Sequence, residues 1–291
     1  MSDAPETTVA INDTTNSSDK WTAALNKDGL RGDYAHMLPD YTVDQKWEDY
    51  TAAEHSLYRR LCERQLKLLP KYACTEFISS MDHLGAPDQI PRLEVVSVKL
   101  RKATGWELVG VPGLIPDAAF FKHLSCRRFP VTTWIRKPEE FDYIVEPDVF
   151  HDFFGHAPLL FNPFFADYMQ AYGQGGLKAQ WLNALPLLGR LYWYTVEFGL
   201  IRTPQGLRAY GAGIMSSGGE LMHCIDSPAP SRESFDIETV MSTDFRIDAY
   251  QDVYFVIDSF EDLAKKTEQD FTPIYARLRD IAARNPAKER G

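Results

Sequence analysis

Cysteine is scarce in this sequence, and the few cysteines lie far apart. The 291 residues contain four of them, Cys62, Cys74, Cys126 and Cys224, and none belongs to a CxxC pair. Zinc sites built on cysteine need closely spaced thiolates, so this spacing argues against such a site. Scattered cysteines in a chain of this size predict reduced thiols in a reducing compartment, and we expect a cytoplasmic protein.

Basic residues are also few relative to acidic ones. Lysine and arginine number 31 against 41 aspartates and glutamates, which leaves a net charge of −10. Such a chain has little with which to neutralise a phosphate backbone, so we expect no nucleic-acid partner. No run of about 18 apolar residues occurs, and we expect no membrane span. Residues 1–20 lack the basic and apolar regions of a secretory signal and are predicted to be disordered.

Most of the remaining chain shows helical periodicity. Apolar spacing predicts a helix from Trp47 to Leu69 that ends at Pro70, and a second helix stopped by Gly85. Further helical patterns cover 147–156, 162–173, 177–200 and 251–284, and a strand, a loop and a helix start cover 208–221. A Val-rich stretch predicts a strand pair in 92–111, and 127–136 is expected to be extended. We expect a mainly α (α+β) fold in a single domain over 21–291, with residues 1–20 outside it.

The zinc-peptidase motif HExxH is absent, but "EPDVFHDFFGHAPLLF" (146–161) holds two histidines five residues apart. On an ideal helix His151 and His156 would lie about 140° apart. Their rings can converge only if the helix ends or distorts between them, and Gly155 and Pro158 favour such a break. One interpretation is a pair of hydrogen-bonded core histidines. We favour a metal site, because polar groups are rarely buried without a partner and a dry apolar shell suits a metal.

A third ligand is predicted far downstream, in "GRLYWYTVEFGLI" (189–201). Glu197 is the single carboxylate of this aromatic and β-branched helix, where an unpaired charge is costly. The alternative is a surface glutamate paired with Arg190 or Arg202. Two histidines and one carboxylate form the facial set of non-haem iron(II) enzymes. A zinc hydrolase with the same ligands and a bound water is a rival hypothesis, and so is a partner-binding protein that has lost its chemistry.

Four motifs together carry a family resemblance: "WIR" (134–136), "EPDVFHDFFGHAPLL" (146–160), "YWYTVEFGLI" (192–201) and "AYGAGIMSSGGEL" (209–221). In this order and spacing the sequence resembles the pterin-dependent aromatic amino acid hydroxylases, most closely the bacterial phenylalanine-hydroxylating members. The resemblance covers about 93–268. It implies a catalytic domain that uses iron(II), a tetrahydropterin and O₂ to convert L-phenylalanine to L-tyrosine. Tyrosine and tryptophan are the competing substrates, and Trp193 favours phenylalanine.

The resemblance also implies roles for individual residues. The iron ligands, which are also the catalytic residues, fall on His151, His156 and Glu197. The substrate contacts fall on Arg136 for the carboxylate, on Pro147, Trp193 and Phe198 for the ring, and on Gly213 and Ser216 near the backbone end. The pterin contacts fall on Val111, Leu114, Ile115, Phe120 and Asp152. A guanidinium can grip a carboxylate with two hydrogen bonds, which agrees with the role implied for Arg136.

The sequence departs from the animal members of this family in several places. Ile144 stands where they carry a threonine near the substrate, and Gly218 stands where they carry a bulky aromatic residue. The lead-in before the domain is too short for a regulatory domain, and the tail has no tetramerising coiled coil. These departures argue against tetramer formation and against carrying over allosteric activation by phenylalanine, and we expect a monomer.

Overall fold

The computed structural model describes residues 31–85, 87–247 and 249–284, so the predicted disorder of 1–20 lies outside the described residues. The helices are α2 (Ala52–Tyr72), α3 (Thr75–Leu84), α4 (Leu93–Ala103), α5 (Asp117–Ser125), α6 (Pro163–Trp181), α7 (Leu185–Tyr192), α8 (Ala212–Ser216), α9 (Gly218–Asp226), α10 (Ile237–Ser242), α11 (Phe260–Thr267) and α12 (Thr272–Arg284). Short 3₁₀ turns are η1 (Tyr34–His36), η2 (Trp47–Asp49), η3 (Pro138–Glu140) and η5 (Pro158–Phe161), and two π-helical turns are η4 (His151–His156) and η6 (Trp193–Glu197). The mainly α (α+β) prediction is confirmed.

The strands form two small sheets. They are β1 (Glu107–Val111), β2 (Arg128–Thr132), β3 (Leu200–Thr203), β4 (Gly206–Ala209), β5 (Ser231–Ser234) and β6 (Val253–Ile257). β1 and β2 pair in parallel, with Glu107 opposite Arg128. The other sheet has the order β4-β3-β6-β5, in which β3 and β4 are antiparallel and the remaining neighbours are parallel.

The predicted strand pair in 92–111 is wrong in its first half, which forms α4. Leu93, Val96 and Leu100 are buried on one face, whereas Val95 and Val98 are exposed. This burial follows the helical period of 3.6 rather than the strand period of 2, so the spacing outweighed the β preference of valine. Only the second half is a strand, and its partner β2 lies further along the chain.

Several predicted boundaries also move. The first long helix begins at Ala52, because Thr51 and Glu54 form a capping box there, and it runs past Pro70 to Tyr72. The helices predicted over 162–173 and 177–200 are α6, which continues to Trp181, then α7 and η6, and the chain is already a strand at Leu200. The predicted 251–284 helix begins as strand β6. Gly85 does end α3, with a positive φ of 94°.

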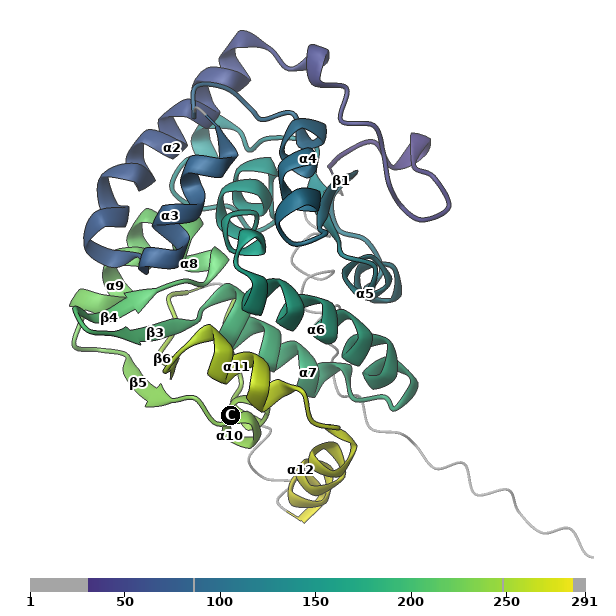
Figure 1. Ribbon diagram of the computed structural model, residues 1–291, viewed down its shortest axis with the longest axis vertical. Coiled ribbons are helices and arrows are strands. Elements are labelled where there is room, and N and C mark those ends of the chain that lie inside the picture. The colour runs from purple at the N-terminus through teal and green to yellow at the C-terminus, as the bar shows by residue number, and fades with distance from the viewer. Residues whose placement is uncertain (1–30, 86, 248, 285–291) are drawn as a thin grey trace, which may run out of the picture.

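The helices pack around one core of aromatic and aliphatic side chains. Figure 1 shows α6 and α7 crossing the middle of the molecule together, with the four-stranded sheet to one side and α2, α3 and α4 above them. α8 packs on η4, and η6 follows directly from α7. This packing brings the two π-helical turns to the same place in the interior.

Candidate active site

The two histidines of the 146–161 motif meet because their segment is a π-helical turn. In such a turn the hydrogen bonds span five residues, so residues five apart lie one above the other. The Nε2 atoms of His151 and His156 are 3.3 Å apart. The predicted distortion is therefore present, but the helix does not fray, and His156 is buried. Gly155 contributes by admitting α8, since a Cβ there would lie 2.8 Å from the carbonyl oxygen of Ala212.

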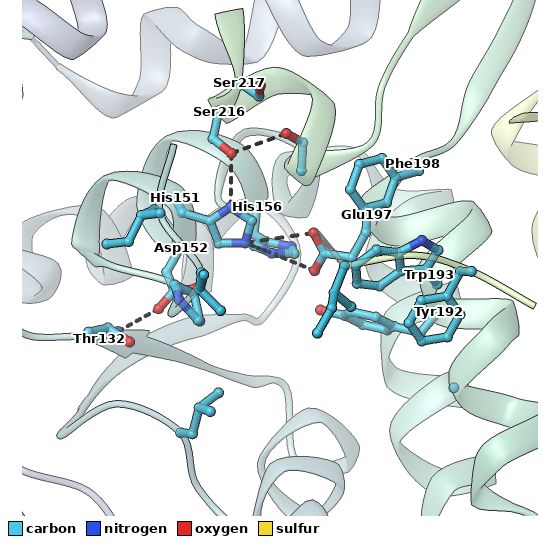
Figure 2. Close-up of a pocket in the computed structure, with 18 of the residues that line it drawn as sticks. Thr132, His151, Asp152, His156, Tyr192, Trp193, Glu197, Phe198, Ser216 and Ser217 are labelled. Atoms are coloured by element: carbon cyan, nitrogen blue, oxygen red, sulfur yellow. Dashed lines mark hydrogen bonds and ion pairs between the residues drawn. The ribbon is translucent and has the colours of Figure 1, made fainter. Parts of the chain in front are cut away.

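Glu197 reaches the same point from the second π-helical turn, η6. Its Oε1 lies 3.2 Å from His156 Nε2, and its Oε2 lies 3.6 Å from His151 Nε2. Figure 2 shows the carboxylate facing the two imidazoles. The alternative of a surface ion pair is wrong, because Arg190 pairs with Asp244 and Arg202 with Asp258.

The protonation of these groups suits a divalent cation. Burial lowers the pKa of His151 to about 4, which leaves the imidazole neutral at neutral pH. Burial opposes ionisation of Glu197, but the attraction of His156 and His151 outweighs it and lowers the pKa of the carboxyl. Two imidazole nitrogens and one carboxylate that lie 3.2 to 3.6 Å from one another form a donor set that fits iron(II).

A second carboxylate, Asp152, lies near the same histidines. Its ligand atom and those of His151 and His156 all lie within 4.8 Å of one another. Asp152 Oδ2, however, accepts a hydrogen bond of 2.7 Å from the backbone N–H of Thr132, and burial raises the pKa of this carboxyl to about 7. Glu197 is the stronger candidate for the third ligand, because its carboxylate faces both imidazoles.

Ser216, at the end of α8, orients the first histidine. Its hydroxyl donates to the carbonyl oxygen of Ala212 at 2.9 Å and lies 2.8 Å from His151 Nδ1. Since the hydroxyl has one proton to donate, it accepts from Nδ1–H, and the Nε2 lone pair of His151 faces the cavity. This contact adds a role to the predicted substrate contact of Ser216, and it could not be anticipated without knowing that α8 packs on η4.

Arg136 is held by a buried carboxylate, Asp148, that was not among the predicted site residues. Arg136 Nε and Nη2 donate to Asp148 Oδ2 and Oδ1 at 2.8 and 2.9 Å. Burial opposes ionisation of Asp148, but Arg136 outweighs it and lowers its pKa. Asp148 Oδ1 also accepts the backbone N–H of His151 at 3.0 Å, which links the arginine to the histidine turn.

All of the predicted site residues line one cavity of about 710 Å³. From the metal and substrate groups these are His151, His156, Glu197, Arg136, Pro147, Trp193, Phe198, Gly213 and Ser216, and from the pterin group Val111, Leu114, Ile115, Phe120 and Asp152. The cavity also has walls that the sequence reasoning missed, among them Tyr192, Phe245 and Gln251. Phe245 and Gln251 lie outside the four motifs. Tyr192 lies in one of them, but its residue type alone does not indicate a functional role.

The fold and the cavity define a mainly α, non-haem metalloenzyme with an aromatic-lined pocket. The family model for biopterin-dependent aromatic amino acid hydroxylases matches residues 31–281, and the chain belongs to this family. It is a pterin-dependent hydroxylase, and its cofactors are iron(II) and a tetrahydropterin. In the described residues no helix has the length and apolarity needed to cross a membrane.

Similar proteins agree with this assignment. The chain is 54% identical over 247 residues to the phenylalanine-4-hydroxylase of Chromobacterium violaceum, covering 84% of this chain and 83% of that protein. It is 54% identical over 258 residues to the phenylalanine-4-hydroxylase of Ralstonia nicotianae, covering 86% and 82%. The crystal structure of the C. violaceum phenylalanine hydroxylase bound to cobalt superimposes with a TM-score of 0.83 at 54% identity, covering 84% of this chain and 89% of that one.

Proposed function

We propose that this chain hydroxylates L-phenylalanine to L-tyrosine with O₂ and a tetrahydropterin. The observation that carries the proposal is the convergence of two imidazoles and one carboxylate at the wall of a cavity lined with aromatic side chains. The names of the similar bacterial proteins support phenylalanine as the substrate.

His151, His156 and Glu197 would hold the iron. When bound, iron(II) and the reduced pterin together would supply the activation of O₂ that the reaction needs. The chain fixes the geometry of the ligands. The Ser216 hydroxyl keeps the His151 proton on Nδ1, and the two π-helical turns bring the three ligand atoms together. Both imidazoles face a cavity whose lining is largely apolar and aromatic, a setting that suits a metal site.

The amino acid would be held at both ends. Asp148 holds the guanidinium of Arg136 by Nε and Nη2, which leaves Nη1 directed away from Asp148 and able to donate to a substrate carboxylate. Gly213 and Ser216 also line the cavity. Trp193, Phe198 and Pro147 offer apolar faces for the phenyl ring, and the rings of Trp193 and Phe198 lie 4.6 Å apart.

The pterin would lie against the loop that follows β1. Val111, Leu114, Ile115 and Phe120 line this side of the cavity, and Asp152 faces it from η4. Gly113 takes a φ of +150°, and a Cβ there would lie 2.8 Å from the Tyr34 hydroxyl, so this position requires glycine. Without a side chain at Gly113, the backbone of this loop can approach a planar heterocycle closely.

We further propose that residues 21–291 form a single catalytic domain that works as a monomer in the cytoplasm. One core joins buried side chains from Leu57 to Leu278, which supports a single domain. All four cysteines are free thiols, which supports a reducing compartment.

The test is a reconstitution assay. Purified protein is loaded with iron(II) and given L-phenylalanine, a tetrahydropterin and air, and tyrosine is measured beside a folded Glu197→Ala variant. Tyrosine from the wild type alone supports both the reaction and the ligand set. Product from L-tryptophan but not from L-phenylalanine would change the substrate only. Failure with every aromatic amino acid would overturn the proposal and favour a hydrolase.

A further inference from the structure

The ring end of the cavity is built around one tryptophan. The Trp193 ring contacts two phenylalanine rings: Phe198 lies 4.6 Å away at a tilt of 33°, and Phe245 is stacked on it 4.2 Å away at 17°. Trp193 begins η6 and Phe198 follows its last residue, with the Phe198 N–H donating to the Trp193 carbonyl oxygen at 2.8 Å, so the π-helical turn that aims Glu197 also brings these rings together. Phe245 belongs to a separate segment, which must be held in place by other contacts.

Besides the ring contact between Trp193 and Phe245, a hydrogen-bonding side chain, Gln251, also joins Trp193 to that segment. The indole Nε1–H donates to Gln251 Oε1 at 2.9 Å, and Gln251 is only 3% exposed. The amide nitrogen of Gln251 donates to the carbonyl oxygens of Arg246 and Ala249 at 2.7 and 3.3 Å. These carbonyls belong to what we name the Phe245 wall, which consists of the cavity-lining residues Phe245, Arg246, Ile247, Ala249 and Tyr250.

The chemistry of the partners determines which end of the Gln251 amide points where. An indole N–H only donates and a backbone carbonyl only accepts, so the amide oxygen must face Trp193 and the amide nitrogen must face the wall. Glutamate cannot donate to both carbonyls, and methionine can make none of these bonds. The backbone N–H of Gln251 is fixed as well, since it donates to Glu220 Oε1 at 3.1 Å.

We propose that Gln251 is a positioning residue that determines which aromatic ring the enzyme accepts. Its hydrogen bonds link the Trp193 indole to the Phe245 wall. The orientation of the indole therefore depends on the position of the wall, and the two surfaces beside the substrate ring keep a fixed arrangement. Gln251 acts through Trp193 rather than on the reacting atoms. The inference rests on the proposed function, because it concerns the ring end of that same site.

The physical reason is that the reaction rate is sensitive to small displacements of the groups that position the substrate. A shift of about 1 Å in a positioning group can lower the rate by about 100-fold. Without Gln251 the buried indole N–H and the carbonyl oxygens of Arg246 and Ala249 lose these hydrogen bonds. A buried polar group that loses a hydrogen bond is destabilised, so these groups should shift toward water. A displaced ring end should accept larger rings more readily and should hold phenylalanine less well for hydroxylation.

The experiment is a double-mutant cycle in the full-length, iron-loaded enzyme. Gln251→Met, Trp193→Phe and the double variant are compared for kcat/KM with L-phenylalanine and with L-tryptophan, and for tyrosine formed per tetrahydropterin oxidised. We expect Gln251→Met to lower the preference for phenylalanine by about tenfold and to lower the yield per pterin. The double variant should lie within about threefold of Gln251→Met, because the tryptophan is already released.

A matched control is Trp106→Phe. Trp106 also donates its indole N–H within the core, to the carbonyl oxygen of Ala166 at 3.2 Å, and it does not line the cavity. This variant should lower the melting temperature but leave substrate preference and yield per pterin unchanged. Gln251→Leu, of similar size and without a charge, removes the same hydrogen bonds and should show the same loss of preference, which provides a second variant if Gln251→Met folds poorly.

Additive effects of the two single substitutions, or an equal loss of preference in Trp106→Phe, would overturn the inference. Calorimetric binding of L-phenylalanine gives a readout that does not depend on turnover: Gln251→Met should weaken it about tenfold, and unchanged binding would count against Gln251. A wild type that binds L-phenylalanine but makes no tyrosine would sink the proposed function while leaving the role of Gln251 open to this binding test.

Discussion

The two sides of the cavity are held by different kinds of interaction. On the metal side, buried polar side chains hold one another, as in the contacts of Ser216 with His151 and of Arg136 with Asp148. On the pterin-loop side, apolar side chains form the surface and single hydrogen bonds hold the backbone, such as that from the Tyr34 hydroxyl to the carbonyl oxygen of Leu114 at 3.1 Å.

The metal side therefore depends on the directions of its hydrogen bonds and ion pairs, whereas the loop side depends on the shape of its apolar surface. A buried ion pair or ligand set has one working geometry, and removing one member leaves a charge without its partner. An apolar loop can shift by tenths of an ångström at modest cost. Substitutions on the metal side should therefore abolish activity, whereas substitutions on the loop side should give graded changes in the affinity for pterin.

The largest effect is expected at Glu197. Glu197→Gln keeps the size of the side chain but removes the charge that faces His151 and His156. We expect iron to be lost on dialysis and kcat/KM to fall by about 10³-fold or more. Metal analysis and the tyrosine assay measure the two effects. Glu233→Gln, at an exposed glutamate, is the control, and retention of iron and activity by Glu197→Gln would remove Glu197 from the ligand set.

The next largest effect is expected at Arg136. Arg136→Lys keeps the charge but cannot make the paired bonds to Asp148, so we expect the KM for L-phenylalanine to rise about 100-fold. Unfolding should become easier by about 2–4 kcal/mol, since a buried pair is left imperfect. Steady-state kinetics and thermal unfolding measure this. Arg202→Lys, in an exposed pair with Asp258, should change neither; an unchanged KM in Arg136→Lys would refute the carboxylate role.

The same difference decides what the sequence could reveal. On the metal side, histidines in an apolar segment and one glutamate in an aromatic helix are chemically conspicuous, and their residue types alone indicate a site. The convergence of His151 and His156 could be expected only as a distortion, because a π-helical turn depends on how α8 packs beside Gly155. The pairing of Asp148 with Arg136 could not be predicted, because the two residues lie on different segments that meet only in the folded chain.

On the loop side, the residues became candidates through resemblance to a family and not through their own chemistry. Val111, Leu114 and Ile115 are ordinary apolar residues whose cavity-facing role depends on tertiary packing. The fold shows a similar limit. The helical period of α4 was present in Leu93, Val96 and Leu100, but the β preference of valine concealed it. Gln251 carries no local signal at all, because its three partners come together only in the folded chain.

A smaller effect is expected from Gly113→Ala in the pterin loop. The added Cβ would meet the Tyr34 hydroxyl at 2.8 Å and Glu146 Oε1 at 2.9 Å, and φ is +150°. We expect the KM for tetrahydropterin to rise about tenfold while the KM for L-phenylalanine changes little. Gly85→Ala is the matched control, since its φ is also positive, at +94°, but its Cβ would meet nothing within 4 Å. An equal rise in both KM values would mean that the loop does not act on pterin alone.

The smallest effect is expected from Tyr34→Phe, which removes only the hydroxyl that donates to Leu114 and keeps the ring. A single hydrogen bond of this kind contributes about 1 kcal/mol, so the KM for tetrahydropterin should rise by about fivefold at most. Tyr50→Phe, which loses a bond to the carbonyl oxygen of Thr133, should lower stability by a similar amount without this change in KM. A rise in this KM as large as the rise expected for L-phenylalanine in Arg136→Lys would show that the loop is held as rigidly as the metal side. The proposed difference between the two sides of the cavity would then be wrong. A small, pterin-specific change would instead mean that the loop tolerates displacement because its contacts with the cofactor depend on shape.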